Sequence, residues 1–156
     1  MIQQRTDKVE LESASAGEYE EILEVWEASV RATHHFVSED EIHFYRPLIL
    51  QQLLPQVQLT CARNEAGNML GFSGVADGKL EMLFLHPAVR GKGIGRKLLQ
   101  HAVQQQKVTK VDVNEENEQA VGFYLHEGFQ VASRSPVDGM GNPHPILHLE
   151  LVESKA

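Results

Sequence analysis

Three glycines and three basic residues stand together in one short stretch of the chain, residues 90–96, which reads Arg-Gly-Lys-Gly-Ile-Gly-Arg. An apolar segment precedes this stretch, and a segment with apolar residues at helical spacing follows it. Glycines allow a tight turn and a close approach of the backbone to a ligand. The first turn of a helix adds unpaired N–H groups and the positive end of the helix dipole. The stretch therefore predicts a cradle for phosphate oxygens.

Two common nucleotide-binding loops do not fit this stretch. A dinucleotide-binding G-x-G-x-x-G motif needs a glycine or alanine where the chain has Leu98. A nucleoside-triphosphate loop ends in Gly-Lys-Ser/Thr, which is missing here. A glycine-rich turn without a ligand stays open as an alternative, although three glycines beside three cations are costly for a plain turn.

The composition is that of an ordinary globular protein. The 156 residues, 42% hydrophobic and 23% charged, fit one domain, residues 1–156, with one core. A formal net charge of −8 disfavours general nucleic-acid binding, which needs a basic face, and is compatible with a cationic acceptor. The single cysteine, Cys61, excludes an internal disulfide and a multi-thiolate metal site, so no metal is expected.

The sequence shows no obvious membrane-spanning segment or export signal. No apolar stretch approaches the roughly 20 residues that a membrane span needs. The polar start, MIQQRTDKVELES, lacks the apolar core of an export signal. We therefore expect a cytoplasmic protein with no membrane partner and no nucleic-acid partner.

The order of the predicted elements indicates an α/β layer structure with a mixed sheet. Apolar spacing predicts a first helix over 16–33, and Ser38-Glu39-Asp40-Glu41 is typical of a capping box that opens a second helix, which runs towards Gln52 and ends before Pro55. A third helix begins at the glycine stretch, and a fourth covers 118–127, closed by Gly128. Strands are predicted at 9–13, 57–63, 69–75, 80–85, 110–113, 129–133 and 146–151.

Two motifs in this order resemble those of the GCN5-related N-acetyltransferase (GNAT) family. Arg90-x-x-Gly93-x-Gly95 after an apolar strand is similar to the family's pyrophosphate-binding signature. The stretch from Asn117 through Ala120 and Tyr124 to Gly128-Phe129 is similar to its second motif, and residues 26–36 resemble the first helix of small bacterial members. The resemblance implies a single GNAT-like domain, with a mixed, mostly antiparallel sheet of about six to seven strands flanked by about four helices.

The resemblance also implies roles for individual residues. Leu83, Phe84 and Leu85 would pair with the pantetheine arm of acetyl-coenzyme A (acetyl-CoA), and the N–H near Leu83 would face the thioester oxygen. Tyr124 would be the general acid that protonates the leaving thiolate; from helical spacing alone, a core tyrosine is the alternative. Asn117 would contact the pantetheine arm. The pyrophosphate would be held by Arg90, Gly91, Lys92, Gly93, Ile94, Gly95 and Arg96.

The general base is less determined by the sequence. Glu81 is unusual between Leu80 and Met82 and is predicted as the base, acting directly or through water. A solvated edge residue or a salt-bridge partner is the alternative. Strict alternation would place Glu81, Leu83 and Leu85 on one face of the strand, unless a bulge intervenes.

Four residues near the first helices are candidates for the acceptor site. His34 and His35 are rival bases or acceptor-site residues, although adjacent helical residues point about 100° apart and cannot both face one site. Trp26 and Phe36 would wall the acceptor site, with a core position as the alternative for Trp26.

The resemblance implies an N-acetyltransferase that moves an acetyl group from acetyl-CoA to an amine by direct transfer through a tetrahedral intermediate. Two alternatives stay open: a CoA-binding module with a sensing role, and a nucleotide-binding protein without thioester chemistry. The acceptor is expected to be a small-molecule or peptide amine, and the protein a monomer or a homodimer.

Overall fold

A computed structural model of the protein describes residues 8–33 and 37–152. The strands are β1 (Glu10–Ser13), β2 (Gln58–Arg63), β3 (Met69–Ala76), β4 (Lys79–Leu85), β5 (Lys110–Asn114), β6 (Phe129–Ser135) and β7 (Ile146–Leu151). The main helices are α1 (Tyr19–Thr33), α2 (Glu39–Leu48), α3 (Ile94–Gln106) and α4 (Glu118–His126). The predicted fold class, element order, sheet and helices are confirmed within these residues.

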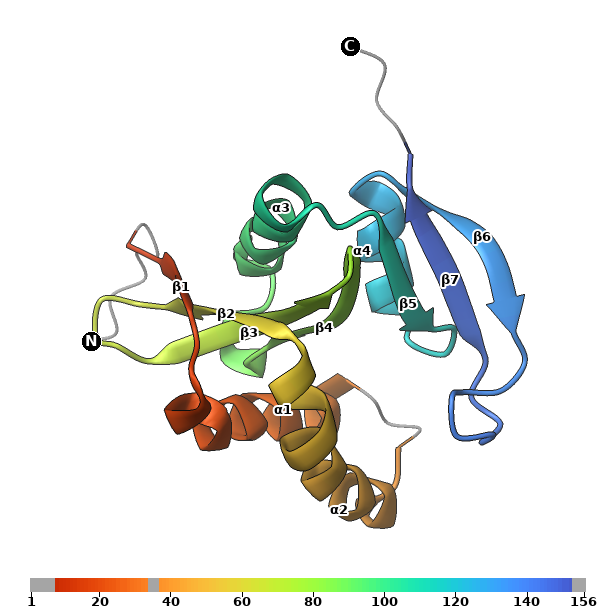
Figure 1. The fold of residues 1–156 in the computed structure, drawn as a ribbon, viewed down its shortest axis with the longest axis horizontal. Helices are drawn as coiled ribbons and strands as arrows, with labels where there is room; N and C mark the ends of the chain where they lie inside the picture. Colours follow the sequence, from red (N-terminus) through yellow and green to blue (C-terminus); the bar gives the residue numbers. More distant parts are fainter. Residues whose placement is uncertain (1–7, 34–36, 153–156) are drawn as a thin grey trace.

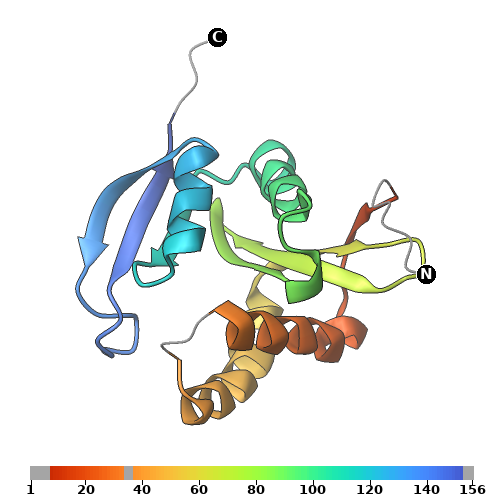
Figure 2. The same cartoon turned by 180° about the vertical axis from the view of Figure 1, so that it is seen from behind.

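All seven described strands form one sheet in the order β1-β2-β3-β4-β5-β7-β6. Only β4 and β5 run parallel, and only two residue pairs join them: Lys79 with Lys110, and Leu80 with Val111. Beyond these pairs the two strands diverge, as the separate ribbons of β4 and β5 show in Figures 1 and 2. The divergence leaves one edge of β4 without a strand partner along most of its length.

A β-bulge at Glu81 changes which way the side chains of β4 point. Val75 pairs with Leu80 and Gly74 pairs with Met82, so Glu81 is an extra residue on β4. Leu80 packs with Leu99 and other residues of α3, whereas Met82 packs in the cluster that contains α1 residues. The bulge therefore interrupts the strict alternation of side chains along β4, which would hold only without a bulge.

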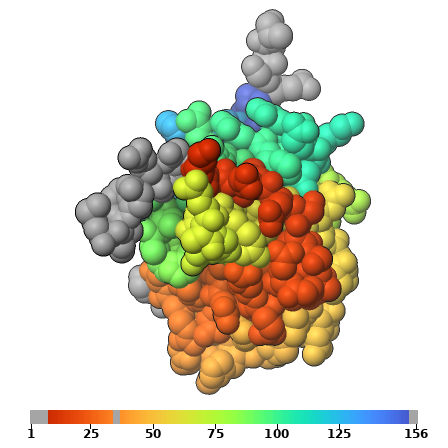
Figure 3. All heavy atoms as spheres, turned by 90° about the vertical axis from the view of Figure 1, so that its left-hand side faces the viewer, coloured from red at the N-terminus to blue at the C-terminus, as the bar shows by residue number. Residues whose placement is uncertain are grey.

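Helices cover both faces of the sheet. α3 and α4 pack on one face, and α1 with α2 packs on the other, which Figure 1 shows as helices above and below the strands. Figure 3, viewed from the β1 side, shows the same layering in filled atoms, with α1 and α2 below β1. The largest fully buried side chains come from both layers and include Phe72, Ile22, Leu23 and Leu98.

The second helix begins at the predicted capping box and is followed by two short helical turns of other types. The capping box is confirmed: Glu41 N donates to Ser38 Oγ at 3.1 Å, and Ser38 N donates to the Glu41 carboxylate at 2.9 Å. Pro47 lies inside α2, and the chain continues as a π-helical turn, η2 (Ile49–Leu53), and a short 3-10 turn, η3 (Leu54–Gln56). Pro47 lacks an N–H and so cannot donate a helical hydrogen bond. Pro55 sits at the start of the separate turn η3, where a missing N–H costs nothing, so α2 and η2 both end before Pro55, as the sequence predicts.

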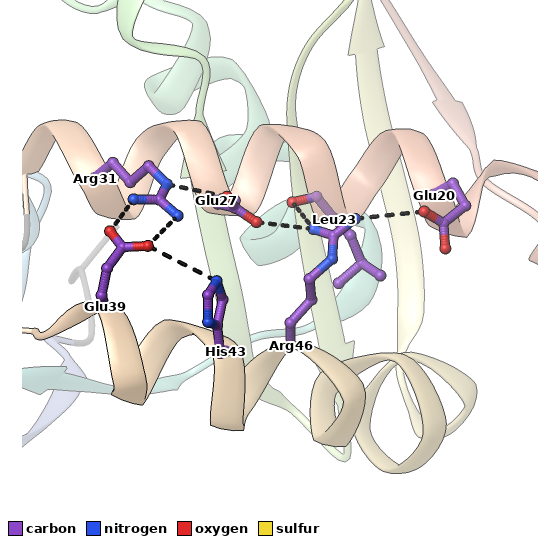
Figure 4. Close-up of polar contacts among 7 residues, drawn as sticks. All are labelled: Glu20, Leu23, Glu27, Arg31, Glu39, His43 and Arg46. Carbon is purple, nitrogen blue, oxygen red and sulfur yellow. Dashed lines mark hydrogen bonds and ion pairs between the residues drawn. The ribbon is translucent and has the colours of Figure 1, made fainter.

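Ion pairs fasten α2 to α1, as Figure 4 shows. Arg31 contacts Glu27 at 3.0 Å and also pairs with Glu39, and Arg46 contacts Glu27 at 3.2 Å and Glu20 at 3.4 Å. Arg46 also donates to the carbonyl of Leu23. These contacts orient the two helices relative to each other, and exposed pairs of this kind add little stability individually.

A second ion-pair cluster holds β1, the start of α1 and β2 together. Arg63 contacts Glu12 at 3.3 Å, Glu18 at 2.7 Å and Glu21 at 2.8 Å. Glu12, Glu18 and Cys61 lie close enough for a metal site, but the Arg63 guanidinium already pairs with both carboxylates. Burial raises the pKa of the Cys61 thiol, which lies in the core as a small apolar side chain.

Across the described part of the chain, no helix is both long and apolar enough to cross a membrane.

Candidate active site

A cavity of about 540 Å³ occupies the gap where β4 and β5 diverge. Its lining comes from both faces of the sheet, with α1 on one side and the glycine loop and α4 on the other. The residues that line it are Ser29, Thr33, Leu80, Glu81, Met82, Leu83, Phe84, Leu85, Arg90, Gly91, Gly95, Val111, Asp112, Val113, Asn114, Asn117, Gln119, Ala120, Phe123 and Tyr124. Residues from both layers of helices therefore meet at this one cavity.

The glycine loop forms one end of this cavity. Gly91 and Gly93 have φ angles of +81° and +82°, the left-handed region that glycine adopts without strain. Gly93 is the N-cap of α3 and offers no side-chain cap, so the amides of the first turn keep no intrahelical acceptor. At Gly95, an added Cβ would lie 3.3 Å from Leu85 Cδ1, so a glycine lets α3 approach β4 closely. These uncapped amides fit a diphosphate.

The three cations of the loop have different positions. Arg90 lines the cavity and donates a hydrogen bond from Nη2 to Gln119 Oε1 of α4. Arg96 pairs with Glu127 at 3.4 Å, next to the end of α4. Lys92 is exposed in the loop. The loop is thus tied to α4 through two of its three cationic side chains.

The open edge of β4 presents backbone groups to the cavity. His86 N donates to Leu70 O of β3 at 2.8 Å. Hydrogen-bonded and non-bonded pairs alternate along antiparallel strands, so the N–H groups of Leu83 and Leu85 point away from β3. They face the side on which β5 has diverged, and both residues line the cavity. Phe84 also lines it and packs on Phe72, with ring centroids 5.7 Å apart.

Tyr124 lies in the core and lines the cavity at the same time. Its side chain is 6% exposed and stacks edge to face with Phe123 and Phe129, at centroid distances of 5.2 and 5.9 Å. Burial raises the pKa of the Tyr124 phenol well above its ordinary value of 10. The hydroxyl is therefore protonated at neutral pH, as a proton donor must be.

Two further predicted residues, Glu81 and Asn117, also line the cavity. Glu81 is exposed at the bulge, beside the last residue pair between β4 and β5. Asn117 is the N-cap of α4, and its side-chain oxygen accepts from Ala120 N at 3.2 Å. Because this cap fixes the start of α4, it also fixes the position of Tyr124 two turns later.

Of the four predicted acceptor residues, the structure describes Trp26. Trp26 is 5% exposed and packs in the core with Ile22 and Met82, and it is not part of the cavity lining. His34, His35 and Phe36 lie outside the described residues. Ser29 and Thr33 are the residues of α1 that line the cavity.

Five polar residues of the cavity lining are not predicted from the sequence: Ser29, Thr33, Asp112, Asn114 and Gln119. Asp112 interrupts the apolar residues of β5 between Val111 and Val113, which is a signal of alternation that could have been read. Ser29 is polar and 6% exposed on the apolar side of α1, a second signal. Neither residue can be assigned to the site from the sequence alone, because the cavity forms only where β4 and β5 diverge.

Comparison with known proteins identifies the family of this chain. Residues 55–131 match the Acetyltransferase (GNAT) domain family. Peptidyl-lysine N-acetyltransferase YjaB of Escherichia coli is 42% identical over 135 residues, which are 86% of this chain and 91% of that protein. Peptidyl-lysine N-acetyltransferase YiaC of E. coli is 27% identical over 92% of this chain and 99% of that protein.

Solved structures agree with these sequence matches. The solution structure of apo-form YjaB from E. coli covers 94% of this chain and 99% of its own, with a TM-score of 0.84 and 38% identity. The PaiA N-acetyltransferase of Thermoplasma acidophilum in complex with coenzyme A shares the fold over 92% of this chain and 99% of its own, with a TM-score of 0.71 and 22% identity. The chain belongs to the GNAT family and is an acetyltransferase.

Proposed function

We propose that this protein transfers the acetyl group of acetyl-CoA to the side-chain amine of lysine residues in proteins or peptides. The observation that supports the proposal is the cavity between β4 and β5, whose lining includes the glycine loop, Tyr124 and residues of α1. The similarity to relatives named peptidyl-lysine N-acetyltransferases supports the acceptor class.

Binding of the donor follows from the glycine loop and β4. The amides around residues 92–95 and the cation of Arg90 would hold the diphosphate, and the open edge of β4 would pair with the pantetheine arm as an added strand does. Asn117 would contact the same arm. When bound, acetyl-CoA supplies the thioester, and the N–H of Leu83 would stabilise the negative charge that develops on its oxygen during attack.

Two side chains would move the protons. The acceptor arrives as an ammonium and must lose a proton before it can attack; Glu81 would accept that proton directly or through one water. The amine nitrogen then forms the new amide bond while the carbon–sulfur bond breaks. Tyr124 would protonate the departing sulfur to give the neutral thiol, and the second proton that the nitrogen loses would restore the Tyr124 hydroxyl. Transfer is direct, so no residue of this chain carries the acetyl group.

The experiment is a turnover assay with acetyl-CoA against three acceptors: a lysine peptide, the same peptide with only its N-terminal amine free, and a polyamine. We expect CoA release with the lysine peptide and a mass gain of one acetyl group at the lysine side chain. Turnover on the N-terminal amine alone would contradict the acceptor class. CoA binding by calorimetry with no turnover on any amine would favour a sensing module of the same fold.

A thermal-shift comparison tests the donor independently. CoA is expected to raise the melting temperature more than ATP or NAD at equal concentration, because a ligand at a hundredfold excess over its dissociation constant adds about 2.7 kcal/mol. A larger shift with ATP would overturn the assignment of the glycine loop to CoA.

A further inference from the structure

Four polar side chains form a connected row across four neighbouring strands, here called the polar row: Lys79 on β4, Asp112 on β5, His148 on β7 and Ser135 on β6. Lys79 Nζ lies 2.6 Å from Asp112 Oδ2. Asp112 Oδ1 lies 2.7 Å from His148 Nδ1, and His148 Nε2 lies 2.7 Å from Ser135 Oγ. Three short contacts therefore fix the Asp112 carboxylate and the His148 ring.

The polar row faces the side of the sheet that carries α1 and α2. Val111 and Val113, the neighbours of Asp112, pack in the cluster that includes Leu99 of α3 and Tyr124 of α4, so Asp112 points to the opposite side. His148 pairs with Asp112 in register and lies on the same side. Figure 1 shows β5, β7 and β6 side by side, beyond the area that α1 and α2 cover.

Asp112 is the member of the polar row that lines the active-site cavity, and Lys79 does not line it. Asp112 lines the cavity together with Glu81 and with Ser29 of α1, whereas His148 and Ser135 do not line it. The connectivity of Ser135, His148 and Asp112 matches that of a hydrolytic triad. In a triad, however, the serine faces the substrate, and here the carboxylate does. The contacts of the polar row therefore hold the Asp112 carboxylate at the lining of the cavity.

Asp112 already pairs with Lys79 through Oδ2, and its ionised carboxylate is a better acceptor of further donors than of a proton. Burial raises the pKa of Asp112, but hydrogen bonds from Lys79 and His148 outweigh burial and hold the pKa below its ordinary value. With an ionised carboxylate, His148 Nδ1–H donates to Asp112 and Nε2 accepts from the Ser135 hydroxyl. Each carboxylate oxygen has two lone-pair sites, so each can accept a further donor.

We propose that Asp112 binds the ammonium of the acceptor lysine at the mouth of the cavity, and that His148 is the positioning residue that holds Asp112 in place. Glu81 lies across the gap on β4, so the ammonium would sit between two carboxylates on opposite strands. The inference rests on the proposed function. It adds an acceptor residue on β5 that is separate from the donor site and from the proton donor Tyr124.

A binding experiment tests this without turnover. N-acetyl-lysinamide, which carries one free side-chain amine, is added to the CoA-bound protein, and the imidazole ¹⁵N resonances of His148 are followed by NMR. We expect the Nδ1 resonance to move, because the ammonium competes with Nδ1–H for the carboxylate. N-acetyl-norleucinamide, which lacks the amine, is the matched probe and should move it little. No response to the amine at saturation would overturn the proposal.

Kinetics give a second test. Asp112→Asn should raise KM for the lysine peptide about 10-fold to 100-fold, the usual effect of losing a charged hydrogen bond, and leave KM for acetyl-CoA unchanged. His148→Ala should give part of this loss, and His148→Asn, which restores an N–H donor, should recover most of it. Ser133→Ala, next to the row on exposed β6, is the control. An unchanged peptide KM in Asp112→Asn would contradict the proposal.

The outcomes separate the two proposals. If the amine moves the His148 resonance but no acceptor is acetylated, the acetyl-transfer proposal fails and the binding site stands. If lysine is acetylated but neither the resonance nor the Asp112→Asn KM changes, the acetyl transfer stands and the binding site fails. Circular dichroism of each variant, with Asp112→Glu as a second substitution, distinguishes a lost contact from a lost fold.

Discussion

Leu80 and Met82 stand two residues apart on one strand and pack on opposite faces of the sheet. Glu81 is the extra residue between them, and it lies where β4 and β5 lose their pairing. The bulge therefore does two things at one position: it re-aims the side chains of the second half of β4, and it sets a carboxylate at the edge of the cavity.

This position makes Glu81 the first residue to test for proton removal. Glu81→Gln should lower kcat about 10² to 10⁴-fold if it is the base, the usual range for a positioned base. The loss should shrink at high pH, where the free amine is already populated. The matched control is Glu65→Gln in the turn between β2 and β3, which should retain full activity. A Glu81→Gln enzyme with the wild-type pH–rate profile would exclude Glu81.

Tyr124 is expected to act through its hydroxyl and not through its ring. Tyr124→Phe keeps the stacking with Phe123 and Phe129, so the melting temperature should change little. Loss of the proton donor should lower kcat by about 10²-fold or more, with an unchanged dissociation constant for CoA. Tyr45→Phe, which removes a hydroxyl bonded to Asn142 outside the cavity lining, is the control. Equal rates for Tyr124→Phe and wild type would remove the proposed acid.

A methyl group should be harmful at Gly93 of the glycine loop and tolerated at Gly139, between β6 and β7. Gly93 has a φ of +82°, so Gly93→Ala is strained by about 1 kcal/mol or more and displaces the first-turn amides. We expect the dissociation constant for CoA to rise about 10-fold. Gly139 has an ordinary φ and open space around its Cβ position, so Gly139→Ala should bind CoA normally. Calorimetric titration of both variants gives the comparison.

The ion pairs of Arg63 with Glu18 and Glu21 should make the free energy of unfolding depend on pH. Hydrogen bonds from Arg63 hold the pKa values of Glu18 and Glu21 below their ordinary value of 4.5. A lowered folded-state pKa means that the stabilisation is present above pH 4.5 and is lost as the pH falls through the folded-state values. Arg63→Met should lower the free energy of unfolding by about 1–3 kcal/mol at pH 7 and by less at pH 3. A pH-independent difference in melting temperature would contradict this account.

His144 should give a pH dependence of the opposite sign. It contacts Glu116 at 2.9 Å and Glu41 at 3.2 Å, joining the β6–β7 loop to α2, and these carboxylates raise its pKa above 6.5. The stabilisation is therefore full below pH 6.5 and is lost as the pH rises through the folded-state value. The difference in melting temperature between wild type and His144→Gln should be greatest near pH 6 and vanish at pH 9. We expect less than about 1 kcal/mol, since the site is partly exposed.

The sequence predicts the elements well because their signals are local. Helical spacing finds α3, the capping box finds the start of α2, and turn residues separate β2, β3 and β4. The glycine loop and Tyr124 follow from motifs, and the structure places both at one cavity. What the sequence does not reveal depends on pairing between distant strands. Asp112, His148 and Ser135 meet only through the registers of β5, β7 and β6, which no local pattern encodes.

The two residue pairs between β4 and β5 have one more consequence, for motion. They divide the sheet into a block of β1 to β4 and a block of β5, β7 and β6, each held by its own antiparallel pairings. A small rotation of one block against the other about this seam would widen or narrow the cavity and leave the strand pairings within each block intact. Such a rotation would disturb the backbone pairing at Lys79–Lys110 and Leu80–Val111 alone among the described strands.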